Sequence, residues 1–164
     1  MGDPKKPKKQ YNTPSHPWEK ERIDHEKIIM KEYGLANKKE IWKFNTRLAN
    51  FKAQAKKCAT AETEQIQKEK VQLLTKLRRY GLLNEKGDID DVLGLQVEDL
   101  LNRRLQSVVN KKNLTTTIKQ ARQFIVHGHV EVDSKKVTIP SYLVSTDEEE
   151  RISIKESLIQ VKEK

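Results

Sequence analysis

The sequence is poor in cysteine and in long apolar runs, and each shortage excludes a class of protein. Cys58 is the only cysteine, so the chain can form no intramolecular disulfide and no thiolate zinc cluster. No stretch approaches about 18 apolar residues, and no apolar signal core follows the first charges. We therefore expect a soluble protein of the reducing cytoplasm, with no membrane contact.

Motifs that carry catalysis are also missing. The sequence has no Gly-rich phosphate loop, no His–Glu metal motif and no nucleophile elbow. His127 and His129 have the spacing of a metal pair on a strand. Two histidines alone make a poor site, so a helix-end and turn role is favoured. We expect no enzyme, no cofactor, no metal and no small-molecule substrate.

Basic residues, by contrast, are abundant and unevenly distributed. Lysine and arginine number 33 against 24 acidic residues, a formal net charge of +9. The balance is +8 over residues 1–60, −1 over 61–97, +4 over 98–144 and −2 over 145–164. Two concentrated basic blocks are the charge pattern expected of a protein that binds a polyanion.

The first 17 residues contain four prolines and four lysines and little apolar surface. Such a segment does not bury enough to offset its ordering entropy, so we expect an extended arm over residues 1–17. Basic arms commonly become ordered on nucleic acid, which makes Lys5, Lys6, Lys8 and Lys9 candidate contacts. A disordered solubility tail is the alternative.

Three helices are expected over residues 18–95. The first is capped by Ser15 or His16, has Pro17 in its first turn, and ends at Gly34. The second runs from Lys38 to Cys58 and the third from Ala61 to Tyr80, with Gly81 as its stop. In the second, apolar positions step by three and four, which is typical of a helix: Ile41, Phe44, Leu48, Phe51 and Ala55. Its other face is almost wholly cationic and includes Arg47, while residues 82–95 are expected to connect to a second domain.

The second domain, residues 96–155, is expected to hold two helices and a small antiparallel sheet. One helix runs from Val97 to Asn113, with Arg103 and Arg104 on its solvent sides. The next is capped by Thr115 or Thr116 and carries Lys119, Arg122 and Gln123 on one face. Strands are expected at His129–Asp133, Val137–Ile139 and Arg151–Ile154. The turn between the first two is Ser134–Lys136, and the run Asp147–Glu150 is expected to be a solvated turn.

Three motifs in this half, NRRLQ, ARQFIVHGHV and PSYLV, occur in order at suitable spacing. The stretch that contains them resembles the S-four RNA-binding domain, an αL-type module. The arm GDPKKPKKQYNTPSHPWEKERID and the piece LRRYGLL narrow the resemblance to the family of universal small-subunit ribosomal protein four, in its archaeal form. It covers the chain from Gly2 to about Ile154.

The resemblance implies an α+β fold. A helical N-terminal domain with a basic arm precedes an αL-type RNA-binding domain, in which two helices pack on a small antiparallel sheet. Residues 156–164 are expected to be a flexible tail. Bacterial relatives can bind zinc through N-terminal cysteines, which Cys58 alone does not allow. The family's motifs match residues at three places that approach RNA: Arg103 and Arg104, then Arg122 and Gln123, then Tyr142.

The implied function is that of a primary binder of 16S-type ribosomal RNA in the small subunit, in the cytoplasm. It would recognise a folded junction in the 5′ domain, nucleate assembly, and support decoding accuracy beside small-subunit protein five. Off the ribosome we expect a monomer. The candidate RNA-binding residues are Lys5, Lys6, Lys8, Lys9, Arg47, Arg103, Arg104, Lys111, Lys112, Lys119, Arg122, Gln123, His127 and Tyr142.

Other interpretations of these residues stay open. One alternative is that Arg103 and Arg104 pair along their helix with Glu98 or Asp99, and another is that Lys111 and Lys112 form a solvated loop. A free-standing RNA chaperone is the alternative function of the same class. A helical interaction protein that dimerises through its N-terminal stripe is the alternative of another class, and it predicts weak salt dependence.

Overall fold

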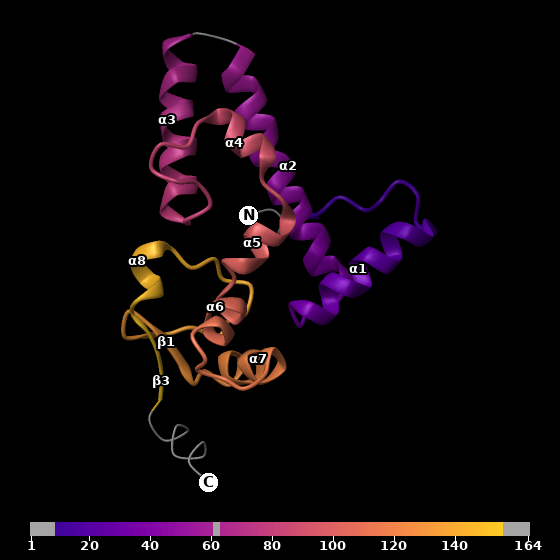
Figure 1. The fold of residues 1–164 in the computed structure, drawn as a ribbon, viewed down its shortest axis with the longest axis vertical. Coiled ribbons are helices and arrows are strands. Elements are labelled where there is room, and N and C mark those ends of the chain that lie inside the picture. Colours follow the sequence, from indigo (N-terminus) through magenta and orange to yellow (C-terminus); the bar gives the residue numbers. More distant parts are fainter. Residues whose placement is uncertain (1–8, 61–62, 156–164) are drawn as a thin grey trace, which may run out of the picture.

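A computed structural model describes residues 9–60 and 63–155 of the chain. Figure 1 shows a helical N-terminal half and a smaller mixed half below it. The helices of the first half are α1 (Lys20–Glu32), α2 (Lys38–Thr60), α3 (Glu64–Arg79), α4 (Ile89–Gly94) and α5 (Val97–Asn102). The second half contains α6 (Leu105–Lys111), α7 (Ile118–Val126), β1 (Val130–Val132), β2 (Lys135–Lys136), α8 (Thr146–Glu149) and β3 (Ile152–Ile154).

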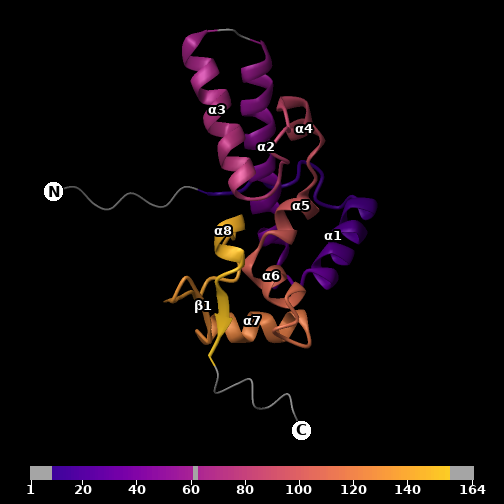
Figure 2. The ribbon, with the colours of Figure 1, turned by 60° about the vertical axis from the view of Figure 1, so that its left-hand side comes forward.

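The long helix α2 organises the first half. α3 runs back along its upper part, and α4 also packs against α2 (Figures 1 and 2). The whole predicted apolar stripe of α2, from Ile41 to Ala55, is buried, and Cys58 continues it. The periodicity of the sequence therefore predicts both the helix and its inner face correctly.

Two glycines end helices of this half as expected. Gly34, after α1, has φ +57°, and Gly81, after α3, has φ +63°. These are left-handed conformations, which glycine adopts without the steric cost of a Cβ.

The start of α1 and the connector differ from expectation. α1 begins at Lys20 rather than near Pro17, because Arg22 donates hydrogen bonds to the carbonyls of His16 and Pro17 and holds those residues outside the helix. Within residues 82–95 a short helix, α4, forms where only a connector was expected. A reciprocal capping box between Asp88 and Asp91 stabilises its first turn.

The single helix expected from Val97 to Asn113 is two helices. The chain is extended at Arg104, which forms an isolated antiparallel bridge with Leu143. Leu105 N donates to Tyr142 O at 2.8 Å, and Val144 N donates to Arg103 O at 3.0 Å. The break between α5 and α6 thus exists because its backbone pairs with the loop that precedes α8.

The three strands form an antiparallel sheet in the order β2-β1-β3. The register pairs Val132 with both Lys135 and Ile152. Only Asp133 and Ser134 link β1 to β2, and both have positive φ, 52° and 63°. Such a two-residue hairpin matches the twist of its strands. The expected turn at Ser134–Lys136 and the strand at Val137–Ile139 are therefore displaced, since pairing begins at Lys135.

Buried apolar residues form two clusters, one in each half. The first gathers the inner faces of α1 to α5 and includes Leu100, Leu101 and Leu143. The second lies between α6, α7 and the sheet, and begins at Leu105. Two helices packed on a small antiparallel sheet, behind a helical N-terminal half, are the α+β fold that the sequence predicts. The division into domains at residue 96 stays a prediction, and the two clusters divide between Leu101 and Leu105.

Candidate nucleic-acid interface

Helix α7 presents the first part of the candidate interface. Thr117 caps it by accepting a hydrogen bond from Gln120 N at 3.2 Å, one residue beyond the caps expected from sequence. Ala121 and Ile125 are fully buried beneath the helix. The opposite side exposes Lys119 and Gln123 and half-buries Arg122 between them. The predicted spacing therefore does place these three polar side chains together.

Arg122 also joins α7 to the first turn of α2. Its Nη2 lies 3.1 Å from Glu40 Oε1, while the other oxygen of Glu40 lies 3.0 Å from Arg104 Nη2. One carboxylate thus serves two guanidinium groups from the second half of the chain. The side chain of Arg122 stays 30% exposed, which leaves part of it available to a ligand.

Arg104 is fully buried, so the expectation that it lies on the solvent side is wrong. Besides Glu40, its guanidinium donates to Tyr33 O and to the side-chain oxygen of Gln106. Burial lowers the pKa of Arg104 to about 10, although the negative charge of Glu40 acts in the opposite direction. At neutral pH the residue is still charged, and in this fold it binds protein rather than solvent.

Helix α8 engages a second group of predicted residues. Arg103 Nη1 lies 2.7 Å from Glu149 Oε2, and Lys112 donates to the Glu149 carbonyl. The Tyr142 hydroxyl donates to Glu148 at 2.8 Å. That hydrogen bond, helped by burial, raises the pKa of Tyr142 to about 12. The acidic run Asp147–Glu150, expected to be a solvated turn, therefore belongs to a short capped helix. This helix binds the side chains of three residues that the sequence predicts to contact RNA.

These two groups face different elements. α8 and α7 lie on opposite sides of α6 in both views (Figures 1 and 2). Lys119, Arg122 and Gln123 belong to α7 beside the start of α2, whereas Arg103, Lys112 and Tyr142 are held by α8. The predicted residues are thus not one continuous patch.

The exposed side of α2 extends the α7 group. Arg47 is exposed there, as are Lys43 and Lys39, four and eight residues before it. Residues spaced by four lie on one side of a helix. Sequence reasoning recognised a cationic face on this helix but selected only Arg47, although the same spacing identifies all three.

The described part of the arm, from Lys9 onward, is docked rather than free. Asn12 N donates to Thr46 Oγ1 at 3.0 Å, and the rings of Tyr11 and Trp42 lie 5.9 Å apart. Lys9 Nζ sits 4.9 Å from the centre of the Tyr11 ring. Lys5, Lys6 and Lys8, also predicted to bind RNA, lie outside the described residues.

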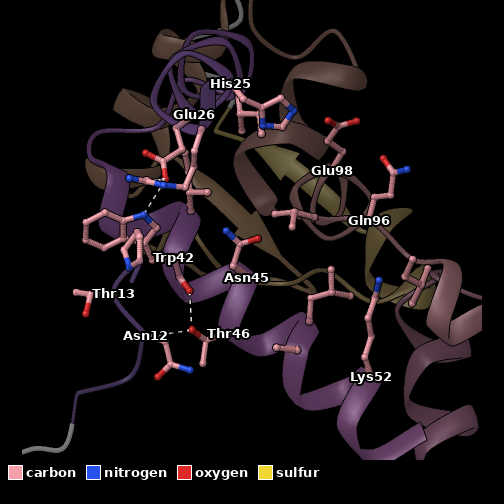
Figure 3. Close-up of a pocket in the computed structure, with 18 residues that line it drawn as sticks. Asn12, Thr13, His25, Glu26, Trp42, Asn45, Thr46, Lys52, Gln96 and Glu98 are labelled. Carbon is pink, nitrogen blue, oxygen red and sulfur yellow. Dashed lines mark hydrogen bonds and ion pairs between the residues drawn. The ribbon is translucent and has the colours of Figure 1, made fainter. Parts of the chain in front are cut away.

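The docked arm forms one wall of a hollow of about 600 Å³, which α1, α2 and residues 95–98 complete (Figure 3). Trp42 Nε1 of α2 donates to Glu26 of α1 at 3.0 Å in the lining of this hollow. Glu26 and Glu98 line the hollow together with His25 and Lys52. Its mixed charges make it a poor site for a polyanion.

The remaining candidates are exposed. Lys111 ends α6, and His127 follows α7, its ring centre 6.2 Å from that of His129. Over residues 9–60 and 63–155, no three His, Cys, Asp or Glu side chains come together as a metal site would require. Within the same residues, every helix is too short or too polar to cross a membrane.

Known proteins resemble this chain at two levels: a family model matches its second half, and relatives match nearly its full length. A family model described as the S4 domain matches residues 103–150, which contain α6, α7, β1, β2 and α8. The chain is therefore a protein with an S4 domain behind a helical N-terminal half.

Relatives cover almost its full length. Small ribosomal subunit protein uS4 of Methanococcus aeolicus is 54% identical over 154 residues, 93% of this chain and 87% of the relative. The protein of the same name from Methanococcus maripaludis strain C5 is 52% identical over 153 residues, 93% and 86% of the two chains. The chain belongs to the family of small ribosomal subunit protein uS4.

Proposed function

We propose that this chain is a structural component of the small ribosomal subunit, in the cytoplasm, and that it binds 16S-type ribosomal RNA directly. The observation that supports this most strongly is the exposed cationic surface that passes from α7 to α2, on Lys119, Arg122, Lys39, Lys43 and Arg47. The membership of the chain in the uS4 family agrees with this role.

In this proposal the positive charge of the protein attracts the RNA, and the shape of the folded RNA determines which RNA is bound. Folded RNA offers phosphates and 2′-hydroxyls, while its deep major groove excludes most side chains. Arginine and lysine on rigid helices suit this target, because each phosphate contact releases condensed counterions. We propose a junction in the 5′ domain as the target, bound early in assembly, with small-subunit protein five as a neighbour that shares an influence on decoding. No chemical reaction is involved.

The test is binding to a 5′-domain fragment of small-subunit ribosomal RNA, beside an unrelated RNA of equal length, at several salt concentrations. We expect a preference for the ribosomal fragment that persists as salt rises, and a monomer in the absence of RNA. Equal binding that disappears for both RNAs at moderate salt would favour a general RNA chaperone. Dimerisation without RNA, with weak salt dependence, would favour a helical interaction protein.

Arg122→Glu tests the α7 surface. It reverses one charge and places a second carboxylate beside Glu40, so RNA affinity is expected to fall by about tenfold or more. Glu131→Arg, on β1, is a control that alters charge at a residue outside the proposed surface. Unchanged affinity in a folded Arg122→Glu protein would contradict the proposed surface.

A further inference from the structure

A second, smaller hollow of about 340 Å³ lies where three distant segments of the chain meet. Gln10 reaches it from the docked arm, Lys43, Arg47 and Asn50 come from α2, and Ser141 comes from the loop before α8. The arm, the helical half and the S4 domain thus each contribute a polar side chain to one site.

The polar side chains of this hollow are suited to an anion. Lysine and arginine carry positive charge, and glutamine, asparagine and serine can all donate hydrogen bonds. None of the described residues that line the hollow carries a carboxylate. The larger hollow of Figure 3 differs, since Glu26 and Glu98 contribute to its wall.

Lys43 and Arg47 form no ion pair with any residue in the described part of the chain. Other cations of the same helix are neutralised: Lys38 lies 3.1 Å from Glu26, and Lys57 lies 3.6 Å from Glu69. Like charges four residues apart on a helix repel each other. An anion between Lys43 and Arg47 would remove that repulsion.

The site is also built in advance of any ligand. The guanidinium of Arg47 lies 5.9 Å from the centre of the Phe44 ring, which is itself buried, and this contact restrains its position. The buried guanidinium of Arg104, paired with Glu40, lies 5.8 Å from the same ring and helps to hold the ring in place behind the hollow. On the other side, the hydrogen bond from Asn12 N to Thr46 keeps the arm beside α2.

We propose that this hollow binds a backbone phosphate of the RNA, with Lys43 and Arg47 as its charged ligands and Gln10, Asn50 and Ser141 as hydrogen-bond donors. The proposal rests on the proposed function and assigns a particular phosphate site to it. Because all three parts of the chain contribute, the bound phosphate contacts the arm, α2 and the S4 domain at once.

The experiment compares two double variants of the full chain for binding to the 5′-domain RNA fragment over a range of salt. Lys43→Met with Arg47→Met removes both charged ligands. Lys31→Met with Lys56→Met removes the same charge from exposed positions of α1 and α2 that lie outside both the hollow and the proposed RNA surface. All four side chains are exposed, so both variants are expected to unfold at the same urea concentration as the wild type.

For the hollow variant we expect the slope of log affinity against log salt to decrease by about one, because one phosphate contact is lost, and affinity to fall by about tenfold or more. The matched control is expected to lose clearly less. Equal losses in the two variants would overturn the proposal, because the hollow would then be no better than any cationic surface. If the wild type failed to prefer the fragment, the proposed function itself would be wrong.

A second measurement does not depend on RNA. Inorganic phosphate is titrated into the wild-type protein, in exchange for chloride at constant ionic strength, while the Arg47 Nε–H signal is followed by NMR. We expect a saturable shift that disappears in Lys43→Met. No saturable shift would overturn the site, and a shift combined with unaltered RNA binding by the hollow variant would identify a site for small free oxyanions instead.

Discussion

Glu40 and Arg104 form a salt bridge of 3.0 Å although 64 positions separate them in the sequence. The arginine is fully buried, and the carboxylate belongs to the first turn of the helix that organises the other half of the chain. The same carboxylate also binds Arg122, so one acidic residue connects the core between the two halves with the proposed RNA surface.

Glu40→Ala is expected to destabilise the protein strongly. Removing the partner of a buried charge leaves that charge uncompensated, which typically costs about 3–5 kcal/mol. Urea denaturation at neutral pH measures the change in the free energy of unfolding. Arg122→Met is the matched control: it removes the half-buried partner but leaves Glu40 paired with the buried Arg104, so it should cost clearly less. Similar small losses in both variants would contradict a structural role for the buried pair.

Tyr142 is expected to ionise late and to make the protein sensitive to alkali. The hydrogen bond to Glu148 raises its pKa to about 12 from an ordinary value of 10.0. A group whose pKa is raised by folding stabilises the folded state below its unfolded pKa and loses that contribution as pH rises towards the folded value. Tyr142→Phe should remove the ionisation step that occurs at the highest pH when the tyrosines are titrated and followed by ultraviolet absorbance. Glu148→Gln should shift that step towards lower pH, and an unshifted step would exclude the assigned cause.

Glu26 is expected to make the protein sensitive to acid. Burial raises its pKa, but hydrogen bonds from Trp42, Lys38 and Arg22 outweigh burial, so the pKa lies below 4.5. The carboxylate therefore stabilises the fold above that value, and the stabilisation is lost as pH falls below it.

Glu26→Gln should lower stability at neutral pH by about 1–3 kcal/mol and flatten the decline in acid. Urea unfolding at a series of pH values compares it with Glu21→Gln, whose side chain is exposed on the same helix. An acid decline equally steep in both variants would show that Glu26 is not its source.

The hairpin between β1 and β2 offers a stabilising change. Ser134 has φ +63°, a conformation that costs a non-glycine residue energy. Glycine relieves this strain but increases the entropy of the unfolded chain. The net effect of Ser134→Gly should be to stabilise the folded protein by about 0.5–1 kcal/mol. Ser153→Gly, at an exposed extended position of β3, should instead destabilise by a similar amount. Thermal unfolding of the two variants should move in opposite directions, and a common decrease would refute the interpretation of the turn.

Local patterns of the sequence are enough to predict the helices that pack along one face. The stripe of α2, the glycine stops after α1 and α3, and the exposed trio on α7 all follow from spacing within one element. The break between α5 and α6 does not, because Val97, Leu101, Leu105 and Val108 keep a helical period across it. Only pairing with residues around Leu143, distant in the sequence, ends the helix at that point.

The same distinction applies to the candidate site. Arg104 is buried because Glu40 meets it from another part of the chain, and no neighbouring residue in the sequence indicates that partner. The hairpin turn was misplaced because Asp133 and Ser134 adopt positive φ without the glycine or asparagine that usually marks it. Gln10 and Ser141 enter one hollow with Arg47 only through folding, so no spacing in the sequence relates them.

The extended residue between α5 and α6 has a consequence for the partner. The backbone there is paired on both sides of Arg104, and the buried guanidinium anchors it to the opposite half. The two halves are therefore held at a fixed relative position, with no hinge between them. A nucleic acid that contacts both halves must adapt its own helices to this fixed arrangement. The conformational adjustment on binding then falls on the RNA, and the sequence-dependent stiffness of the RNA contributes to selection.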